Sequence, residues 1–228
     1  MKTLVSFLIL VNLWASLAQE DLQKMVFIFP ETSSTAAVVL KTPIPQPLTK
    51  FTLCLSYYTL LTRALSLFSY STRSRDNDLL LFKPAPNQYT LYLDNASVSF
   101  TIPGKQVHEP SWEHICVSWE SATGVVELWL DGKPLPRMSL RKGYSVGTEA
   151  SIILGQDQDS FGAGFESQQS FVGELKDVYM WDRVLSAQEM SLVCSGQVLS
   201  NYLINWQALS YEIKGYVVLK PSLLPSFC

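Results

Sequence analysis

The segment from residue 155 to residue 169 concentrates oxygen-bearing side chains in one glycine-rich stretch. It contains three carboxylates, Asp157, Asp159 and Glu166, interspersed with glutamines. Calcium takes about six to eight oxygen ligands, whereas zinc prefers the nitrogen of His and the sulfur of Cys. Because the segment has neither His nor Cys, it predicts a loop that binds a hard cation, calcium above all. A solvated loop held by ordinary Asx turns is the alternative.

The order of the ligands in this loop does not match an EF-hand. Asp157 and Asp159 are followed by Gly162 as in an EF-hand, but the twelfth position is Gln168 instead of a bidentate glutamate. Further ligands would have to come from another part of the fold. The acidic cluster 76–78, Asp-Asn-Asp, opens a strand-like run and could supply them.

The elements that must position these side chains are β-strands. Short alternating segments are separated by Pro, Gly, Asn and Asp, which is typical of a sandwich or jelly roll. Asp131-Gly132 predicts a hairpin, and Ser186 with Glu189 forms a capping box that predicts one short helix over 186–193, ended near Gly196. The predicted strands are 36–40, 79–82, 89–93, 125–130, 151–154 and 178–181.

The N-terminus has the pattern of a secretory signal peptide. Lys2 precedes an apolar run over 4–17, which ends in small residues at Ser16 and Ala18. We therefore expect residues 1–18 to be a signal peptide and 19–228 to form one extracellular domain without a membrane span. The formal net charge of −3 and the scattered basic residues disfavour a nucleic-acid partner.

Four cysteines in a secreted chain indicate disulfides, which four cysteines can form in three pairings. Cys54 and Cys116 lie in strand-like runs, and a bridge between them would join two strands of one core. Cys194 and Cys228 could pair within the chain, link two chains or stay free. Metal binding by these thiols is not indicated, because the chain has no C-x-x-C spacing.

One stretch identifies a family. His114, Cys116, Ser118, Trp119 and Ser121 are spaced as in the pentraxin signature H-x-C-x-S/T-W-x-S/T. Much of the rest of the chain agrees, so that it resembles the short pentraxins over nearly its whole mature length. The agreeing segments are 27–30, 68–70, 75–77, 131–134, 142–144, 150–156 and 205–209.

This resemblance implies a fold and a metal site. The fold is all-β, a two-sheet lectin-like jelly-roll sandwich with one short α-helix, assembled as a homopentamer. The family's disulfide falls on Cys54 and Cys116. Two calcium ions per subunit are implied, with ligands at Asp76, Asn77, Asp157, the Gln158 carbonyl, Asp159, Glu166 and Gln169. Asp157 stands where family members carry a bridging glutamate, which is longer by one methylene group.

The resemblance also implies a ligand pocket beside the metal. Leu80 and Phe82 match its apolar wall. Ser97 replaces the acidic side chain of a phosphocholine binder, and Tyr92 replaces a smaller residue, so phosphoethanolamine or acidic sugars are expected before phosphocholine. The implied function is calcium-dependent pattern recognition in innate immunity, directed at microbes and cell debris, and complement and Fc receptors are the partners known for the family.

Two other classes compete with this interpretation. A glycoside hydrolase on a related sandwich would need a pair of carboxylates at catalytic spacing, and no strand motif supplies one. We expect Trp119, Trp129 and Trp181 to lie in the core and His114 to be a structural histidine, so no enzyme activity is expected. The other alternative is a purely structural interaction protein. Finally, Asn95-Ala96-Ser97 is a candidate N-glycosylation site in a turn.

Overall fold

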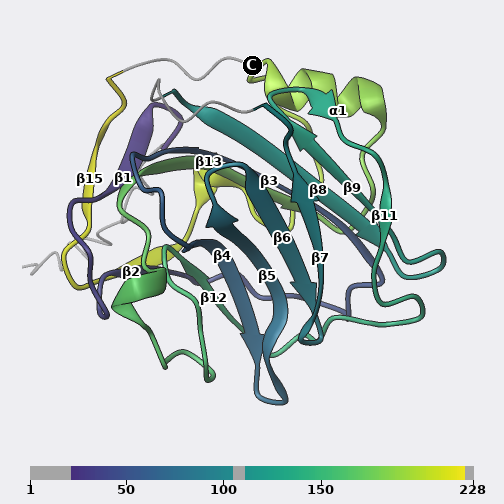
Figure 1. The fold of residues 1–228 in the computed structure, drawn as a ribbon, viewed down its shortest axis with the longest axis horizontal. Helices are drawn as coiled ribbons and strands as arrows, with labels where there is room; N and C mark the ends of the chain where they lie inside the picture. Colours follow the sequence, from purple (N-terminus) through teal and green to yellow (C-terminus); the bar gives the residue numbers. More distant parts are fainter. Residues whose placement is uncertain (1–21, 105–110, 224–228) are drawn as a thin grey trace, which may run out of the picture.

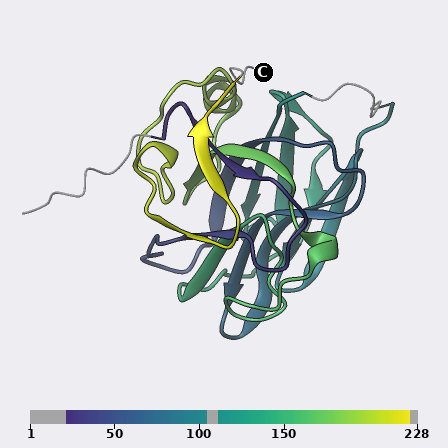
Figure 2. The ribbon, with the colours of Figure 1, turned by 90° about the vertical axis from the view of Figure 1, so that its left-hand side faces the viewer.

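The structure is a computed structural model that describes residues 22–104 and 111–223. The expected signal peptide, His108 and Cys228 lie outside these residues. The described chain folds into two antiparallel sheets stacked as layers, with one short α-helix, which confirms the predicted all-β sandwich (Figures 1 and 2).

The first sheet has eight strands, and its order shows how distant segments meet. Strand β3 lies at its centre between β8 and β13, and β11 pairs with β9 beside β10. In order across the sheet the strands are β10 (Lys133–Pro134), β9 (Val125–Leu130), β8 (Glu113–Glu120), β3 (Lys50–Tyr58), β13 (Gly173–Trp181), β1 (Met25–Phe29) and β15 (Val218–Pro221), with β11 at Met138–Ser139.

The second sheet has seven strands and carries the predicted functional residues. Its middle strands β12, β4 and β5 lie side by side, although β12 is far from the other two in sequence. In order they are β14 (Tyr211–Lys214), β2 (Ala37–Leu40), β12 (Ala150–Leu154), β4 (Leu65–Thr72), β5 (Arg75–Ala85), β6 (Gln88–Leu93) and β7 (Ala96–Thr101).

The core lies between the sheets and is built by alternation. In β5 and β6, Leu79, Leu81, Leu91 and Leu93 belong to the main buried cluster, so their neighbours in sequence face away from it. Burial of this apolar surface is the main favourable contribution to folding. The indole of Trp119, fully buried as predicted, donates to the Leu140 carbonyl at 2.8 Å, so its polar atom is satisfied.

The disulfide and the helix occupy the outer face of the first sheet. Cys54 and Cys116 are directly opposite each other on β3 and β8, and the predicted bridge between them is present. Trp181 and Met190 pack beside it in a separate apolar cluster, joined by half-buried Trp129. Within the described residues, this structure has no helix of the length and apolar character needed to cross a membrane.

Helix α1 (Ala187–Cys194) follows the predicted signals closely. Ser186 is its N-cap, and the capping box with Glu189 is formed in both directions. The helix therefore begins one residue later than predicted, because the capping residue itself keeps an extended backbone. Cys194 at its end is disulfide-bonded, which excludes the alternative of a free thiol. Two 3₁₀ turns complete the structure, η1 (Ser167–Gln169) and η2 (Trp206–Ala208).

Candidate functional site

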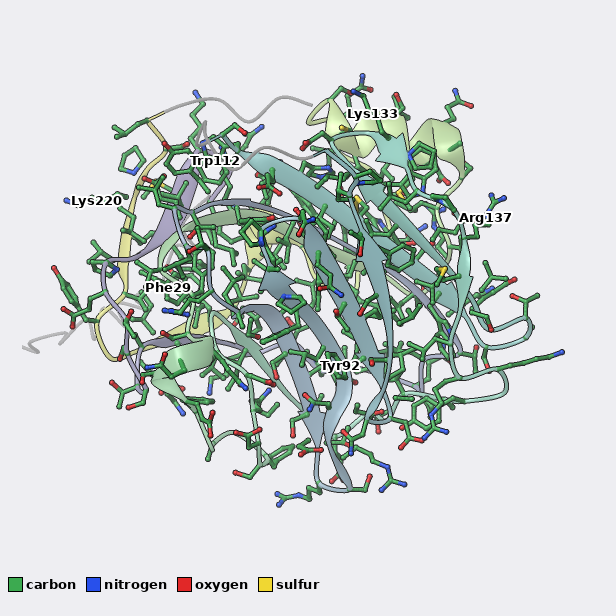
Figure 3. The ribbon with its side chains drawn as sticks, viewed as in Figure 1. Phe29, Tyr92, Trp112, Lys133, Arg137 and Lys220 are labelled. Carbon is green, nitrogen blue, oxygen red and sulfur yellow. A yellow bond between two sulfur atoms is a disulfide. The ribbon has the colours of Figure 1, made fainter. Side chains whose placement is uncertain are left out.

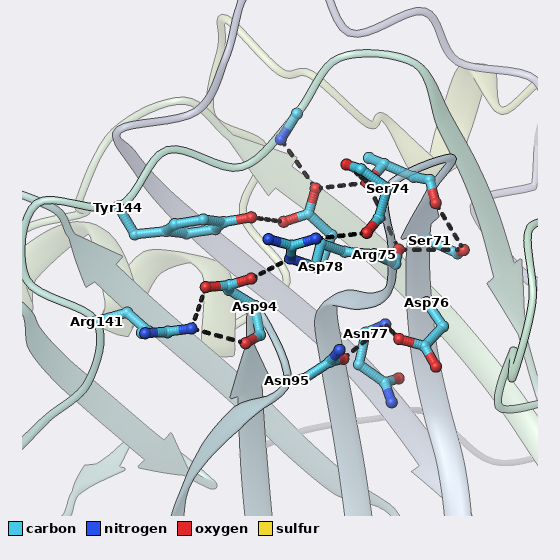
Figure 4. A network of polar contacts seen from close by, with 12 residues as sticks. Ser71, Ser74, Arg75, Asp76, Asn77, Asp78, Asp94, Asn95, Arg141 and Tyr144 are labelled. Carbon is cyan, nitrogen blue, oxygen red and sulfur yellow. Dashed lines mark hydrogen bonds and ion pairs between the residues drawn. The ribbon is translucent and has the colours of Figure 1, made fainter.

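The start of strand β5 is fixed by Asp78. Its carboxylate is buried and accepts hydrogen bonds from the Tyr144 hydroxyl at 2.5 Å, the Gly147 backbone N–H at 3.0 Å and the Thr72 hydroxyl at 3.0 Å. A carboxylate that accepts three hydrogen bonds is held in one position. Asp78 is thus an anchor, and it leaves Asp76 and Asn77, the two residues before it, at the surface end of the strand (Figure 4).

Asn77 is held from the next hairpin. Its backbone N–H donates to the side-chain oxygen of Asn95 at 3.3 Å and to the carboxylate of Asp76 at 3.0 Å. In return, the backbone N–H of Asn95 donates to the Asn77 carbonyl at 3.1 Å. Neither Asn77 side-chain atom is used in these bonds, so the side chain remains available to a ligand.

The segment from 155 to 170 folds back over the second sheet and is fixed by two buried glutamines. The Gln158 amide nitrogen donates to the Ser69 carbonyl, the Ser69 hydroxyl and the Ser151 carbonyl at 3.0 to 3.2 Å. The Gln156 amide nitrogen donates to the carbonyls of Ser33 and Ala36, both at 2.8 Å. These contacts fix the backbone on both sides of Asp157.

The tip of this segment is a tight turn that requires glycine. Gly164 has a φ of +80°, and a Cβ there would approach Asp159 to 2.9 Å. Ser160 and Ala163 close the turn with paired backbone hydrogen bonds. At the other end, Arg63 donates to the carbonyls of Gln168 and Ser170, which holds the chain just after Glu166.

The carboxylates of the two segments lie close enough to perturb one another. The pKa of Asp157 is raised to about 6, first by burial and then by the nearby charges of Asp159, Asp76 and Glu166, while a hydrogen bond from the Gln158 backbone lowers it. Burial also raises the pKa of Asp159, as do Glu166 and Asp76. Four acids from β5 and from the 155–170 segment therefore share one region, and their charges repel each other.

Three of the predicted ligands present a buried oxygen that lacks a hydrogen-bond partner among the described residues. They are Oδ1 of Asn77, Oδ1 of Asp157 and Oε1 of Gln169. The described residues contain seven such side-chain atoms, and these three belong to three of the seven predicted ligands. Buried polar atoms without partners are rare in folded proteins and indicate a missing partner. A donor set made only of oxygen fits a hard cation.

The four residues of the predicted pocket lie on one face of the second sheet. Leu80 is opposite Tyr92, and Tyr92 is opposite Ser97, so these three form one row across β5, β6 and β7. Phe82 meets Tyr92 edge to face with ring centroids 6.4 Å apart, and Tyr92 is labelled in Figure 3. Ser69, which holds Gln158, is opposite Leu80 on the other side, so the row begins beside the 155–170 segment.

Sequence reasoning missed three contributors to this site. Asp78 was grouped with the acidic cluster but serves as its anchor. The side chain of Gln158 matters as much as its carbonyl, because it holds the loop. Asp94 accepts hydrogen bonds from both Arg75 and Arg141, which fixes the β6–β7 turn next to Asn77 (Figure 4). The Asp94-Asn95 pair is a turn signal that could have drawn attention to this position.

A second group of metal-type ligands has a structural explanation. Cys54, His114 and Cys116 place their ligand atoms within 4.8 Å of one another. The two sulfurs are joined in the disulfide, whereas a metal site needs thiolates. Burial lowers the pKa of His114 to about 4, so this imidazole is neutral at neutral pH, in keeping with the structural role predicted for it.

Comparison with known proteins shows to which family the chain is similar. The Pentaxin family model matches residues 25–221. The chain is 48% identical to bovine mucosal pentraxin, covering 97% of this chain and 99% of the relative. It is 47% identical to human C-reactive protein, and the match covers 99% of this chain and 100% of the relative.

A solved structure shows the same fold. The native heptameric serum amyloid P-like pentraxin from Limulus polyphemus superposes with a TM-score of 0.82 at 23% identity, covering 89% of this chain and 97% of that one. The signature around Cys116, the two-sheet fold and these matches agree, and the chain belongs to the pentraxin family.

Proposed function

We propose that this chain is a secreted, calcium-dependent pattern-recognition protein that binds phosphorylated or other anionic groups on microbes and cell debris. The observation that carries the proposal is the convergence of Asp76, Asp157, Asp159 and Glu166 around buried oxygens that have no partner among the described residues. Membership of a family that includes C-reactive protein and serum amyloid P-component supports the role in innate immunity.

Charge and donor type support calcium as the cation. The four carboxylates carry about four negative charges, which two calcium ions would balance. The Asn77 and Gln169 side-chain oxygens and the Gln158 carbonyl add neutral donors. Bound calcium supplies free coordination positions for an anionic oxygen, such as that of a phosphate. The chain's own part is to hold these donors in place through Asp78 and the side chain of Gln158.

The number of ions tests the site directly. Asp157 has a shorter side chain than the glutamate expected at this position. Because calcium–oxygen distances must stay at about 2.3 to 2.6 Å, the shorter carboxylate bridges two calcium ions less well. Calcium is titrated calorimetrically into chelator-stripped protein. Two ions per chain are expected, Asp157→Asn should lose at least one, and Asp182→Asn, an acid after β13, should keep both. No heat in the wild type would overturn the proposal.

Removal of calcium should open the 155–170 segment. Without a cation the four carboxylates repel one another, and the hydrogen bonds of Gln156, Gln158 and Arg63 must hold the loop against this repulsion. Limited proteolysis with calcium and with chelator, read by mass spectrometry, should show cleavage between 157 and 169 only in chelator. Equal cleavage under both conditions would argue against metal binding here.

The pocket residues support a choice among ligands. Exposed Ser97 carries no charge to attract a quaternary ammonium, and Tyr92 adds bulk beside Phe82. We infer a preference for phosphoethanolamine or acidic sugars over phosphocholine. Calcium-dependent retention on phosphoethanolamine resin should exceed retention on phosphocholine resin, and the reverse order would contradict the preference.

Recognition of surfaces by this site would depend on several copies. The Limulus relative is described as a heptamer, and we propose that this chain forms a cyclic oligomer, with a pentamer expected. Simultaneous engagement of several weak sites raises overall affinity for a repetitive surface. Light scattering on the purified protein gives the copy number. We also propose that the chain has no enzyme activity, and hydrolysis of a β-glucan by the purified protein would refute this.

A further inference from the structure

The turn between β6 and β7 lies next to the candidate calcium site. Asp94 and Asn95 form this two-residue turn, with φ of +48° and +60°. Positive φ at both central positions is the geometry of a type I′ hairpin, which Asn adopts readily. Asn95 is exposed, and with Ala96 and Ser97 it forms the acceptor sequence for N-linked glycosylation.

The Asn95 side chain is oriented by Asn77. Its carbonyl oxygen accepts from the Asn77 N–H at 3.3 Å, while its backbone N–H donates to the Asn77 carbonyl at 3.1 Å. The oxygen of the carboxamide is thus engaged, and Nδ2 has no acceptor among the described residues. Attachment of a sugar to Nδ2 would break none of these contacts.

The turn is held firmly by charged neighbours. Arg75 and Arg141 both donate to the carboxylate of Asp94, and Arg141 also donates to its backbone carbonyl at 3.0 Å. A group attached to Asn95 therefore starts from a fixed point, beside Asp76 and Asn77 (Figure 4). Ser97, two residues further on, is in the row with Tyr92 and Leu80. The attachment point adjoins both the candidate metal ligands and the pocket.

We propose that Asn95 carries an N-linked oligosaccharide, and that this glycan limits the size of the ligand that reaches the calcium site. The second part depends on the proposed function. In the transfer, Nδ2 attacks C1 of the first sugar of a lipid-diphosphate-linked oligosaccharide. The N–C1 bond forms, the bond from C1 to the diphosphate breaks, the lipid diphosphate leaves, and one proton is lost from Nδ2.

The glycan changes which ligands can reach the calcium site more than it changes the affinity of the site for a single headgroup. A single phosphate headgroup is small enough to enter beside the glycan, because Asn95 itself is neither a candidate calcium ligand nor one of the pocket residues. A vesicle or polymer presents a broad surface that a branched oligosaccharide rooted at Asn95 keeps at a distance. Glycosylated protein therefore binds free headgroups normally and dense surfaces weakly.

The first experiment locates the glycan. The full-length chain is expressed in mammalian cells and collected from the medium, and the proteolytic peptide that contains Asn95 is analysed by mass spectrometry. A peptide bearing hexose and N-acetylhexosamine is expected. Secreted protein with an unmodified Asn95 peptide would overturn the proposal, whatever the protein binds.

The second experiment tests the size limit on the same polypeptide. An endoglycosidase trims the glycan to one sugar, and binding is measured in calcium to free phosphoethanolamine and to vesicles containing phosphatidylethanolamine. Trimming should increase vesicle binding by about tenfold through restored multivalency and leave free-headgroup binding unchanged. Asn95→Asp, which keeps the acceptor oxygen but cannot be glycosylated, should not respond to the enzyme.

The outcomes separate the two proposals. Vesicle binding that is equal before and after trimming would overturn the size limit. Absence of calcium-dependent binding in both forms would overturn the proposed function and with it the size limit, while a glycopeptide at Asn95 would still establish the modification. A response of Asn95→Asp to the enzyme would show that the effect comes from elsewhere.

Discussion

The side-chain oxygen of Gln158 accepts a hydrogen bond from the backbone N–H of Gly162 at 2.9 Å. The amide nitrogen of the same side chain reaches Ser69 and Ser151 on β4 and β12. The fully buried side chain of Gln158 therefore connects the turn of the loop to the second sheet. The backbone carbonyl of the same residue is a proposed calcium ligand.

Gln158→Leu should weaken calcium binding by about tenfold or more, because partners that orient metal ligands have effects of this size. The leucine fills similar volume but makes none of the four hydrogen bonds. Calorimetric titration measures the change. Gln168→Leu, in the same loop but exposed, is the matched control and should bind calcium like the wild type. Equal affinity in the two variants would show that the Gln158 contacts are dispensable.

Removal of the disulfide should cost about 4 kcal/mol of unfolding free energy in the chain-entropy treatment of a loop this long. Cys54 and Cys116 are 62 residues apart, so the bridge excludes many unfolded conformations. The Cys54→Ala, Cys116→Ala double variant keeps both positions apolar. Its denaturant midpoint is compared with that of the wild type at equal protein and calcium concentrations, since bound ions and assembly also stabilise. An unchanged midpoint would contradict the prediction.

Acid should destabilise the fold through His114. Burial lowers the folded-state pKa of this imidazole from about 6.5 to about 4. As pH falls from about 6.5 towards 4, the unfolded chain binds a proton that the folded chain excludes, so stability declines by about 2 kcal/mol between pH 7 and pH 5. This contribution is fully present above pH 6.5.

His114→Gln separates this effect from other acid-sensitive groups. Denaturation of the variant and the wild type at pH 7 and pH 5, in chelator, gives four free energies. The wild type should lose about 2 kcal/mol more than the variant over this range. An equal loss in both proteins would assign the acid sensitivity to other residues.

Ser186→Ala should destabilise the protein by about 1 kcal/mol, the usual value for the loss of an N-cap side chain. The serine hydroxyl accepts from the Glu189 N–H at 3.3 Å. Ser191→Ala, at an exposed position within helix α1, is the control and should be neutral or slightly stabilising. Thermal unfolding of the two variants side by side tests the difference.

Local signals predicted six of the strands and the helix because their causes are local. Strand β13 shows where this fails. Its predicted extent, 178–181, covers only the second half of the observed strand, Gly173–Trp181. Leu175 and Val178 are both fully buried although they are three residues apart, because the register shifts between Lys176 and Tyr179 and Asp177 adopts a φ of +55°. The bulge breaks the alternation on which strand prediction depends.

Side-chain roles at the site were predictable only in part for a similar reason. The donor chemistry of the proposed calcium site could be read from the oxygen-rich segment, since it belongs to the residues themselves. The function of Asp78 depends on Tyr144 and Gly147, which are 66 and 69 residues away. A buried acid that anchors a strand and an exposed acid that binds metal look alike until the sheet has formed.

Four of the strands at the borders of the two sheets, β10, β15, β14 and β7, also bear on how the protein behaves in concentrated solution. Open strand edges can recruit other chains into fibrils. Strand β10 consists of Lys133 and Pro134 alone, β15 ends with Lys220 and Pro221, and β14 carries Glu212 and Lys214. Charge and proline interrupt edge-to-edge hydrogen bonding. The fold therefore protects three of its borders against amyloid-like growth by composition.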